Sequence, residues 1–422
     1  MRKILQKILK ILAKNILKKY QPLVIGITGS IGKSSAKEAV FSVLKTHFKV
    51  RRTQKNYNNE LGVPLTIIGG DSGQNSFLKW AKVIFRGLNL IIFKKNYPDI
   101  LILEMGADRP GDISYLTQLA QPKTGVVTAI GQFPVHVEFF PETDKLIEEK
   151  SKLIESLSKN GTAVLNYDDL SVRSMRDKTK GKVITYGFGQ GADLTLSEFK
   201  QNFVERKASI SFKAEYGGGV VPIRISRTLG KQQAYAAGSA IAVGLSMGLN
   251  LVEISNVLKK YRPLPGRTSL LRGIKKTWLI DDTYNSSPTA SIAALDLLND
   301  FPIEETEGHR GRKIAVLADM LELGQYVEEG HRYVGQKAAE VADILFVVGP
   351  RAQFIAEEAK KAGLPEERIF KFMEAKEAGL VVQEKMRPAD LVLIKGSRSM
   401  KMERVVKEIM AHPKKAKKLL VH

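Results

Sequence analysis

The chain has 422 residues, of which 43% are apolar, so it is long enough for two or three domains with ordinary buried cores. It contains no cysteine, which excludes disulfides, thiolate zinc or iron–sulfur sites and a cysteine nucleophile. The 66 basic and 44 acidic residues give a net charge of +22, which indicates an anionic partner: a phosphate, a nucleotide, a nucleic acid or a lipid headgroup.

Half of this charge is concentrated in the two tails. Residues 1–20 hold seven Lys or Arg and no acid, and residues 411–422 hold four Lys. The other half is spread thinly along the rest of the chain. This distribution argues against a nucleic-acid-binding surface, so we expect no nucleic-acid partner.

Residues 1–20 predict a helix with one apolar and one lysine-rich face. The apolar residues recur with helical spacing: Ile4, Leu5, Ile8, Leu9, Leu12, Ile16 and Leu17. The frequent lysines argue against a signal peptide. The sequence has no run of 18 apolar residues, so we expect no transmembrane helix. Two interpretations stay open. The helix contacts an anionic membrane surface, or it packs on its own domain with solvated lysines.

Short apolar runs alternate with helical segments from about residue 22. The predicted strands of this first series span residues 24–28, 99–105, 124–130 and 162–166. Such an alternation is typical of βαβ units and a parallel sheet. Residues 193–227 show the period of antiparallel strands instead, and a helical pattern follows over residues 231–261.

The Pro- and Gly-rich stretch YRPLPGR places a domain boundary near Pro265. A second α/β series follows it, with strands in TWLIDDTY, RKIAVLADM, DILFVVG, RIFKFM and DLVLIKGS. The predicted class is α/β: a central P-loop domain with a mostly parallel sheet and a Rossmann-like C-terminal domain. The predicted units are a basic helix (1–20), a central ATP-binding domain (21–265) and a C-terminal domain (266–422).

The strongest local motif is GITGSIGKSS, at residues 26–35, between a predicted strand and a helix. A glycine loop at a helix N-terminus offers backbone N–H groups to phosphate. The strict spacing G-x-x-x-x-G-K fails by one residue, yet the strand–loop–helix context predicts ATP binding. Lys33 is expected at the β- and γ-phosphates and Ser34 at Mg²⁺. The expected nucleotide-binding residues here are Gly29, Ser30, Gly32, Lys33, Ser34 and Ser35.

Polar residues at other predicted strand ends are weaker candidates. Glu104 ends the next parallel strand, where a carboxylate can bind Mg²⁺, and His136 follows a third strand as a possible metal ligand. Asn58, in NYNNELGVP, can position phosphate oxygens or simply form a turn. In the second series, DDTYNSSP places Asp282 for ribose hydroxyls. KGSRSM places Lys395, Ser397 and Arg398 for an anionic carboxylate.

Together these blocks resemble the Mur ligase family of ATP-dependent amide ligases in peptidoglycan synthesis. The blocks that carry the resemblance are TGSIGKSS, NYNNELGVP, EMGADRPGDI, Gly131–His136, LPGR, DDTYNSSP, LADMLELG and KGSRSMKME. They follow the family's order from about residue 22 to 406, nearly the whole chain.

The resemblance implies an enzyme in which a peptide carboxylate attacks the ATP γ-phosphate and an amine then displaces phosphate. It assigns Lys33, Ser34 and Glu104 to phosphate and Mg²⁺, and His136 to a second Mg²⁺. It also implies a CO₂-carboxylated, metal-supporting lysine, for which Lys150 fits best and Lys152 is the alternative. Arg267, Asp282 and Asn285 are expected at the nucleotide, and Lys395 and Arg398 at the substrates.

Two departures from the family pattern stand out. The P-loop begins at residue 26, where family members first carry a UDP-binding domain, so we expect that domain to be absent. The family's His-Asn…Asn pattern is GKQQAYAAG here, with Gln232 and Gln233 first and Ala236 last. Glutamine, chiefly Gln233, can still hydrogen-bond adenine, but the side chain of Ala236 cannot.

The expected reaction joins D-alanyl-D-alanine to a muramyl tripeptide. We expect a monomer in the cytoplasm, with peripheral membrane contact through residues 1–20 as a further possibility. Two alternatives stay open: a Mur-type ligase for a different or lipid-linked acceptor, and a non-catalytic ATP-binding scaffold.

Overall fold

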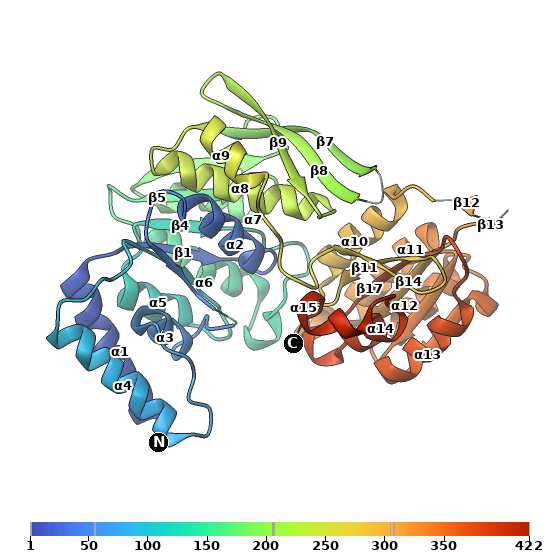
Figure 1. The fold of residues 1–422 in the computed structure, drawn as a ribbon, viewed down its shortest axis with the longest axis horizontal. Coiled ribbons are helices and arrows are strands. Elements are labelled where there is room, and N and C mark those ends of the chain that lie inside the picture. Colours follow the sequence, from blue (N-terminus) through green and yellow to red (C-terminus); the bar gives the residue numbers. More distant parts are fainter. Residues whose placement is uncertain (1, 55, 205–206, 304, 307–308, 422) are drawn as a thin grey trace.

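The computed structural model describes residues 2–54, 56–204, 207–303, 305–306 and 309–421. Two large sheets with helices on both faces dominate it, one toward the left of Figure 1 and one toward the right. Most neighbouring strands are parallel, so the predicted α/β class is confirmed. The domain limits stay a prediction, although the strands of the two large sheets lie on either side of residue 265.

The first sheet has nine strands in the order β2-β3-β1-β4-β5-β6-β7-β8-β9. Neighbours are parallel from β2 to β7, and β7, β8 and β9 pair antiparallel. The strands are β1 (Leu23–Thr28), β2 (Val50–Arg52), β3 (Ile100–Glu104), β4 (Thr124–Val127), β5 (Thr162–Asn166), β6 (Lys182–Gly187), β7 (Leu194–Val204), β8 (Lys207–Tyr216) and β9 (Gly219–Ser226).

The central strands of this sheet are apolar because helices bury both of their faces. In β3, Leu101 and Leu103 belong to one apolar cluster, whereas Ile100 and Ile102 belong to the other. This alternation is the period of two that a strand imposes.

The helices of this part lie in two layers, one on each face of the sheet (Figure 1). α1, α3, α4, α5 and α6 share the first cluster; α2, α8 and α9 share the second. The helices are α1 (Arg2–Tyr20), α2 (Lys33–Leu44), α3 (Gly62–Ile68), α4 (Phe77–Ile92), α5 (Asp112–Ala120), α6 (Thr143–Glu155), α7 (Leu170–Arg173), α8 (Lys231–Ser246) and α9 (Leu251–Leu258).

The second sheet has six strands in the order β10-β11-β17-β14-β15-β16, and only β10 is antiparallel to its neighbour. Its strands are β10 (Ser269–Arg272), β11 (Trp278–Asp282), β14 (Lys313–Ala318), β15 (Ile344–Val348), β16 (Ile369–Phe372) and β17 (Leu391–Lys395), beside a two-stranded ribbon of β12 (Glu305–Thr306) and β13 (His309–Arg310). Its helices are α10 (Pro288–Asp300), α11 (Val327–Val341), α12 (Gln353–Lys361), α13 (Ala375–Lys385), α14 (Glu403–Ile409) and α15 (Ala416–Leu419).

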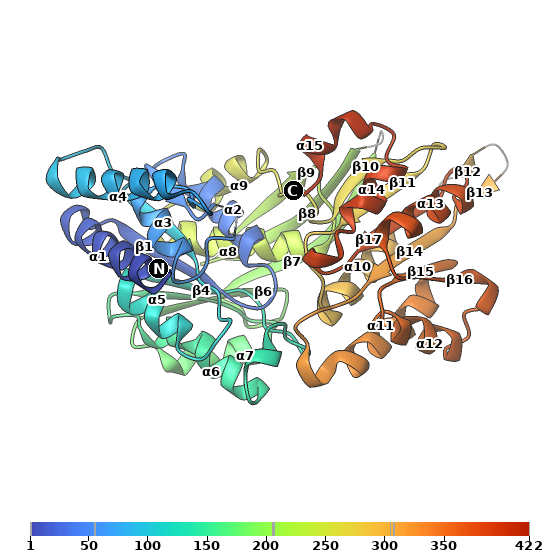
Figure 2. The ribbon, with the colours of Figure 1, turned by 90° about the horizontal axis from the view of Figure 1, so that it is seen from below.

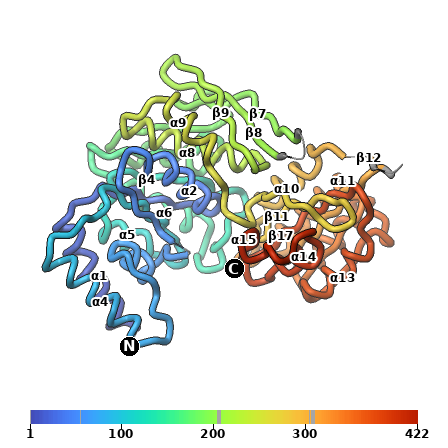
Figure 3. The backbone as a smooth tube through the Cα atoms, in the orientation of Figure 1, coloured from blue at the N-terminus to red at the C-terminus, as the bar shows by residue number. Residues whose placement is uncertain are grey.

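A single extended segment after α9 carries the chain into the second sheet, as the tube in Figure 3 shows. The C-terminal end of the chain packs on this segment. A Cβ on Gly266 would lie 2.3 Å from the side chain of Val421. Gly266 also has a φ of 66°, a value that glycine adopts readily.

The apolar stripe of α1 is used for internal packing. Leu9, Leu12, Ala13 and Ile16 are buried against α3, α4 and α5, and most of the lysines of α1 are exposed. Of the two interpretations of residues 1–20, this arrangement agrees with the one in which the helix packs on its own domain. None of the helices in the described ranges is long and apolar enough to cross a membrane.

Candidate active site

A cleft of about 830 Å³ lies between the two sheets, at the carboxyl ends of β1, β3, β11 and β17. Parallel α/β sheets place their ligand sites at these strand ends. Most of the predicted site residues line this cleft: Ser30, Gly32, Lys33, Ser34, Ser35, Asn58, Glu104, His136, Gln233, Arg267, Asp282, Asn285, Lys395, Ser397 and Arg398. Gly29 and Lys150 lie behind the loop, where the Lys150 Nζ is 3.4 Å from the carbonyl oxygen of Gly29.

The glycine loop is shaped by close contact with the strand beside it. Gly29 has a φ of 140°, and a Cβ there would lie 2.2 Å from the Thr128 hydroxyl. The N–H groups of Ser30 and Ile31 both donate to the carbonyl of Ala129, which fixes the loop. α2 begins directly afterwards, so its first N–H groups face the cleft without intrahelical acceptors. The geometry suits a phosphate group.

Lys33 is partly buried, and its Nζ donates to the carbonyl of Gly29 at 2.7 Å. Burial lowers the pKa of Lys33, and the nearby Glu104 carboxylate opposes this shift. The same Glu104 accepts from Ser34 at 3.3 Å through Oε1 and from the buried Lys37 at 3.2 Å through Oε2. Hydroxyl and carboxylate oxygens are ligands that Mg²⁺ prefers, so Ser34 and Glu104 fit a magnesium ion.

Lys150 is fully buried on α6, where its ammonium form has no carboxylate partner among the described contacts. Burial lowers the pKa of Lys150 well below the ordinary lysine value, and the nearby charge of Lys33 lowers it further. The charge of the preceding Glu149 opposes this shift, but its oxygens accept from the backbone N–H groups of Gly111 and Ile113 and form no ion pair with Lys150. Lys150 is therefore placed to be an uncharged amine. The alternative, Lys152, is exposed and pairs with Glu155.

His136 meets an acid from the second sheet. Its Nδ1 lies 2.9 Å from Glu322 and 3.8 Å from Asp108. The hydrogen bond from His136 lowers the pKa of Glu322. The sequence reasoning missed Glu322, although its motif LADMLELG was among the recognised blocks, because no local pattern shows that it reaches His136.

The hinge residues form a second set of contacts across the cleft. The guanidinium of Arg267 lies 3.9 Å from the ring centre of Tyr284, whose hydroxyl donates to Asn56 at 2.5 Å. Asp282 accepts from the Thr268 N–H and from the Lys395 Nζ. These bonds hold Asp282 in place as a link between hinge and sheet, and its predicted ribose contact stays a prediction.

Lys395 and Arg398, the predicted substrate-binding residues, are both engaged in contacts within the second part of the chain. The Lys395 Nζ also donates to the Asn285 carbonyl at 3.0 Å, while the Arg398 guanidinium lies 3.6 Å from Glu403. The predicted substrate contacts of Lys395 and Arg398 likewise stay predictions. Asn58 braces the loop opposite: its carbonyl accepts from the Gly106 N–H at 2.8 Å.

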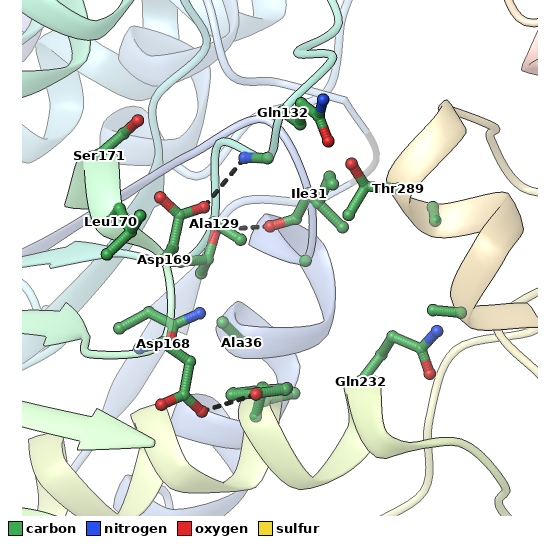
Figure 4. A pocket seen from close by; sticks show the side chains of 18 of the residues that line it. Ile31, Ala36, Ala129, Gln132, Asp168, Asp169, Leu170, Ser171, Gln232 and Thr289 are labelled. Carbon is green, nitrogen blue, oxygen red and sulfur yellow. Dashed lines mark hydrogen bonds between the residues drawn. The ribbon is translucent and has the colours of Figure 1, made fainter. Parts of the chain in front are cut away.

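A second cavity of about 620 Å³ opens beside the glycine loop (Figure 4). Gln232 and Thr289 lie on one side of it, with Asp168 and Asp169 opposite, and Ala236 also lines it. The Oε1 atoms of Gln232, which lines both hollows, and of Gln233, which lines only the first cleft, are buried and have no partner among the described atoms. Unpaired amide acceptors fit an exocyclic amino group, and Ala236 offers none, as predicted from its side chain.

The sequence reasoning missed the far wall of this cavity. Asp168 accepts from the hydroxyl of Tyr235 at 2.7 Å and from two backbone N–H groups. Asp169 accepts from the N–H groups of Ile130 and Gly131 at 2.7 and 2.9 Å. The available signal was the pair of acids directly after the strand that ends at Asn166.

Comparisons with known proteins agree with this geometry. Residues 86–244 match the Mur ligase middle domain, and residues 266–398 match the Mur ligase glutamate ligase domain. The UDP-N-acetylmuramoyl-tripeptide–D-alanyl-D-alanine ligase of Bacillus subtilis is 31% identical over 404 residues, which cover 95% of this chain and 79% of that protein.

Solved structures give the same result. MurF ligase from Thermotoga maritima in complex with ADP matches at 26% identity with a TM-score of 0.76, covering 98% of this chain and 84% of that one. MurF from Acinetobacter baumannii matches at 25% identity with a TM-score of 0.75, covering 94% and 79%. The chain belongs to the Mur ligase family.

Proposed function

We propose that the chain is an ATP-dependent ligase that adds D-alanyl-D-alanine to a UDP-N-acetylmuramoyl tripeptide. The relatives that match along most of their length carry this name. The observation that carries the proposal is one cluster at the glycine loop: Lys33, Ser34, Glu104 and the buried Lys150. A carboxylate-activating ligase needs these group types around a γ-phosphate.

The reaction takes two displacements. A carboxylate oxygen of the tripeptide attacks the γ-phosphorus, and ADP leaves with the electron pair of the broken P–O bond. The amine of the dipeptide then attacks the acyl carbon, phosphate leaves, and the nitrogen loses a proton. Both steps build negative charge on phosphoryl oxygens. Lys33 and the N–H groups at the start of α2 are placed to stabilise that charge.

Mg²⁺ fits the oxygens of Ser34 and Glu104, and a carboxylated Lys150 would add a further anionic ligand. Such an ion, when bound, supplies Lewis-acid stabilisation of phosphoryl charge. His136 is a candidate ligand only if it leaves Glu322, to which it is bonded here.

Carboxylation of Lys150 follows from its environment. Only an uncharged amine attacks CO₂, and the attack forms an N–C bond and releases one proton. Burial keeps Lys150 uncharged, as its lowered pKa indicates. The carbamate anion formed would then lie beside the Lys33 cation, which reverses an unfavourable lysine–lysine pair.

The test uses purified chain, ATP, Mg²⁺, the UDP-muramyl tripeptide and D-alanyl-D-alanine. Phosphate release is expected only when both substrates are present. Release that is independent of the dipeptide would refute the assignment of D-alanyl-D-alanine as the amine substrate. Release with a lipid-linked acceptor alone would move the chain to the other ligase alternative, and no release with either would favour the scaffold.

A carbamate readout complements the activity assay. Labelled ¹³C-bicarbonate should give a carbamate resonance in the wild-type chain, and Lys150→Arg should remove it.

We further propose that the enzyme acts in the cytoplasm, where nucleotide-linked precursors and ATP are present.

A further inference from the structure

Helix α4 presents an apolar stripe to the outside of the molecule. Leu78, Phe85 and Ile92 are spaced by seven residues, which is two helical turns, so they lie along one line. Their exposed fractions are 79%, 69% and 68%. Phe77, Leu88 and Phe93 extend the stripe. The opposite side of α4, at Val83, Gly87 and Leu90, is buried in the domain.

This stripe is the largest concentration of exposed apolar side chains in the described ranges. Of the fifteen large apolar residues that are exposed there, six belong to residues 77–93, which are α4 and its C-cap. Two more, Ile4 and Ile11, belong to α1. Folded chains seldom leave a continuous apolar patch open unless something covers it.

Helices α1 and α4 pack closely against each other and form one unit. They approach closely where a Cβ on Gly87 would lie 3.0 Å from the side chain of Leu12. At their C-terminal ends, Lys19 donates to the carbonyl of Ile91 at 2.7 Å and the Tyr20 hydroxyl donates to that of Leu90 at 2.9 Å. Both views place this unit at the end of the molecule remote from the second sheet (Figures 1 and 2).

Positive charge borders the stripe. Residues 2–20 and 72–98 together hold twelve Lys or Arg and no Asp or Glu. The exposed lysines are Lys3, Lys7, Lys14, Lys18, Lys19, Lys79, Lys82, Lys94 and Lys95, of which Lys19 is bonded to carbonyls of α4. Lys79 and Lys82 lie on α4 itself, beside the apolar line, so apolar and cationic groups share one outer surface.

We propose that the outer face of α4, with the lysines of α1 and α4 around it, docks on an anionic phospholipid bilayer. A bilayer offers a negative headgroup layer directly above an apolar layer, which matches lysines that flank an apolar stripe. A second copy of the chain fits poorly, because the exposed lysines of one copy would face those of the other. The docked helix lies in the plane of the interface and leaves the cleft between the sheets open.

The experiment measures co-sedimentation of the full chain with vesicles of pure phosphatidylglycerol and of pure phosphatidylcholine. Binding is expected only to phosphatidylglycerol, and added salt should weaken it because it screens the lysines. The Leu78→Ser/Phe85→Ser/Ile92→Ser variant should bind these vesicles about tenfold more weakly or worse. Its folding should be unaffected, since the three side chains are exposed; ligase activity and thermal unfolding check this.

Two further variants make the result specific. Lys79→Glu/Lys82→Glu keeps the apolar stripe and should also weaken binding. Met373→Ser/Leu380→Ser removes apolar side chains that are 60% and 49% exposed on the second part, and should change nothing. The proposal is overturned if the wild-type chain does not bind phosphatidylglycerol vesicles, or if the α4 variants bind them as well as the wild type does. It is also overturned if the stripe is the interface of a dimer that the triple variant dissociates.

Discussion

Replacing Lys150 by Met separates a catalytic amine from a structural one. Methionine has nearly the length of the lysine stem and no group that can react with CO₂ or bind a metal. Lys150 is 0% exposed, and its single described hydrogen bond, to Gly29, is long at 3.4 Å. Little packing is lost in this change.

The expected stability change has a definite sign. Because burial lowers the pKa of Lys150, the folded chain binds fewer protons than the unfolded chain between that pKa and the ordinary value of 10.5. Its contribution to stability therefore rises with pH in this window and is unfavourable near neutral pH. Lys150→Met removes the unfavourable contribution, so the free energy of unfolding should rise by about 1–3 kcal/mol, the usual cost of an unsatisfied buried polar group.

Activity should move the other way. Loss of a group that supports transition-state charge typically lowers kcat by about 100-fold, or roughly 2.7 kcal/mol. Phosphate release gives kcat, and urea unfolding in CO₂-free buffer gives stability. The matched control is Lys152→Met, two residues away and exposed, which should leave both unchanged. A Lys150→Met enzyme with near-wild-type kcat, or one that is destabilised, would refute the reasoning.

Three further changes test other parts of the molecule. Gln232→Ala removes a buried amide acceptor beside the second cavity, so the KM for ATP should rise about tenfold with little change in kcat, as steady-state kinetics would show. Tyr284→Phe keeps the ring under Arg267 but loses the bond to Asn56, so the KM for ATP should rise about threefold; an unchanged KM would mean that this bond does not hold the cleft closed. Burial raises the pKa of Asp281 to about 7, so the folded chain holds this proton more tightly and loses about 2–3 kcal/mol of stability from about pH 5 to about pH 8; Asp281→Asn should remove that loss in denaturant titrations at both pH values.

The parts of the site that lie close together in sequence were predictable. The glycine loop, Lys33 and Ser34 occupy ten consecutive residues, and the loop geometry follows from two glycines and a helix start. The ends of neighbouring parallel strands meet at one edge, which brings Glu104 to the same place. Local chemistry and sheet topology suffice for such residues.

Contacts across the hinge could not be predicted from local pattern. His136 and Glu322 belong to different sheets, and their 2.9 Å separation depends on how the two parts close. The bond between Tyr284 and Asn56 has the same origin. The wall of the second cavity at Asp168 was also missed, because the contact between Asp168 and the Tyr235 hydroxyl forms only in the folded chain.

The outward face of α4 was missed for a different reason. The polar residues of this helix gather on one side, and the apolar arc that remains is wider than the part that the domain buries, so the spacing predicts an amphipathic helix without indicating which part of the arc is covered. In α1 the stripe is narrower, and its buried residues coincide with part of the predicted set. The membrane interpretation of residues 1–20 was thus placed on an apolar face that the domain uses itself, whereas the uncovered apolar face belongs to α4.

Positive charge has two physically distinct settings in this chain. Lys150 is buried and Lys33 is partly buried, and the loss of hydration lowers both pKa values. An uncharged Lys150 can react with CO₂, whereas the nearby Glu104 carboxylate favours the charged form of Lys33, which phosphate binding needs. The lysines around α4 are exposed and hydrated, so they act at longer range and are screened by salt. Salt should therefore weaken vesicle binding far more than it weakens charge stabilisation inside the cleft. This difference explains how a chain of +22 can use only a few cations for catalysis, with the surplus on the α1 and α4 surface available for a charged interface.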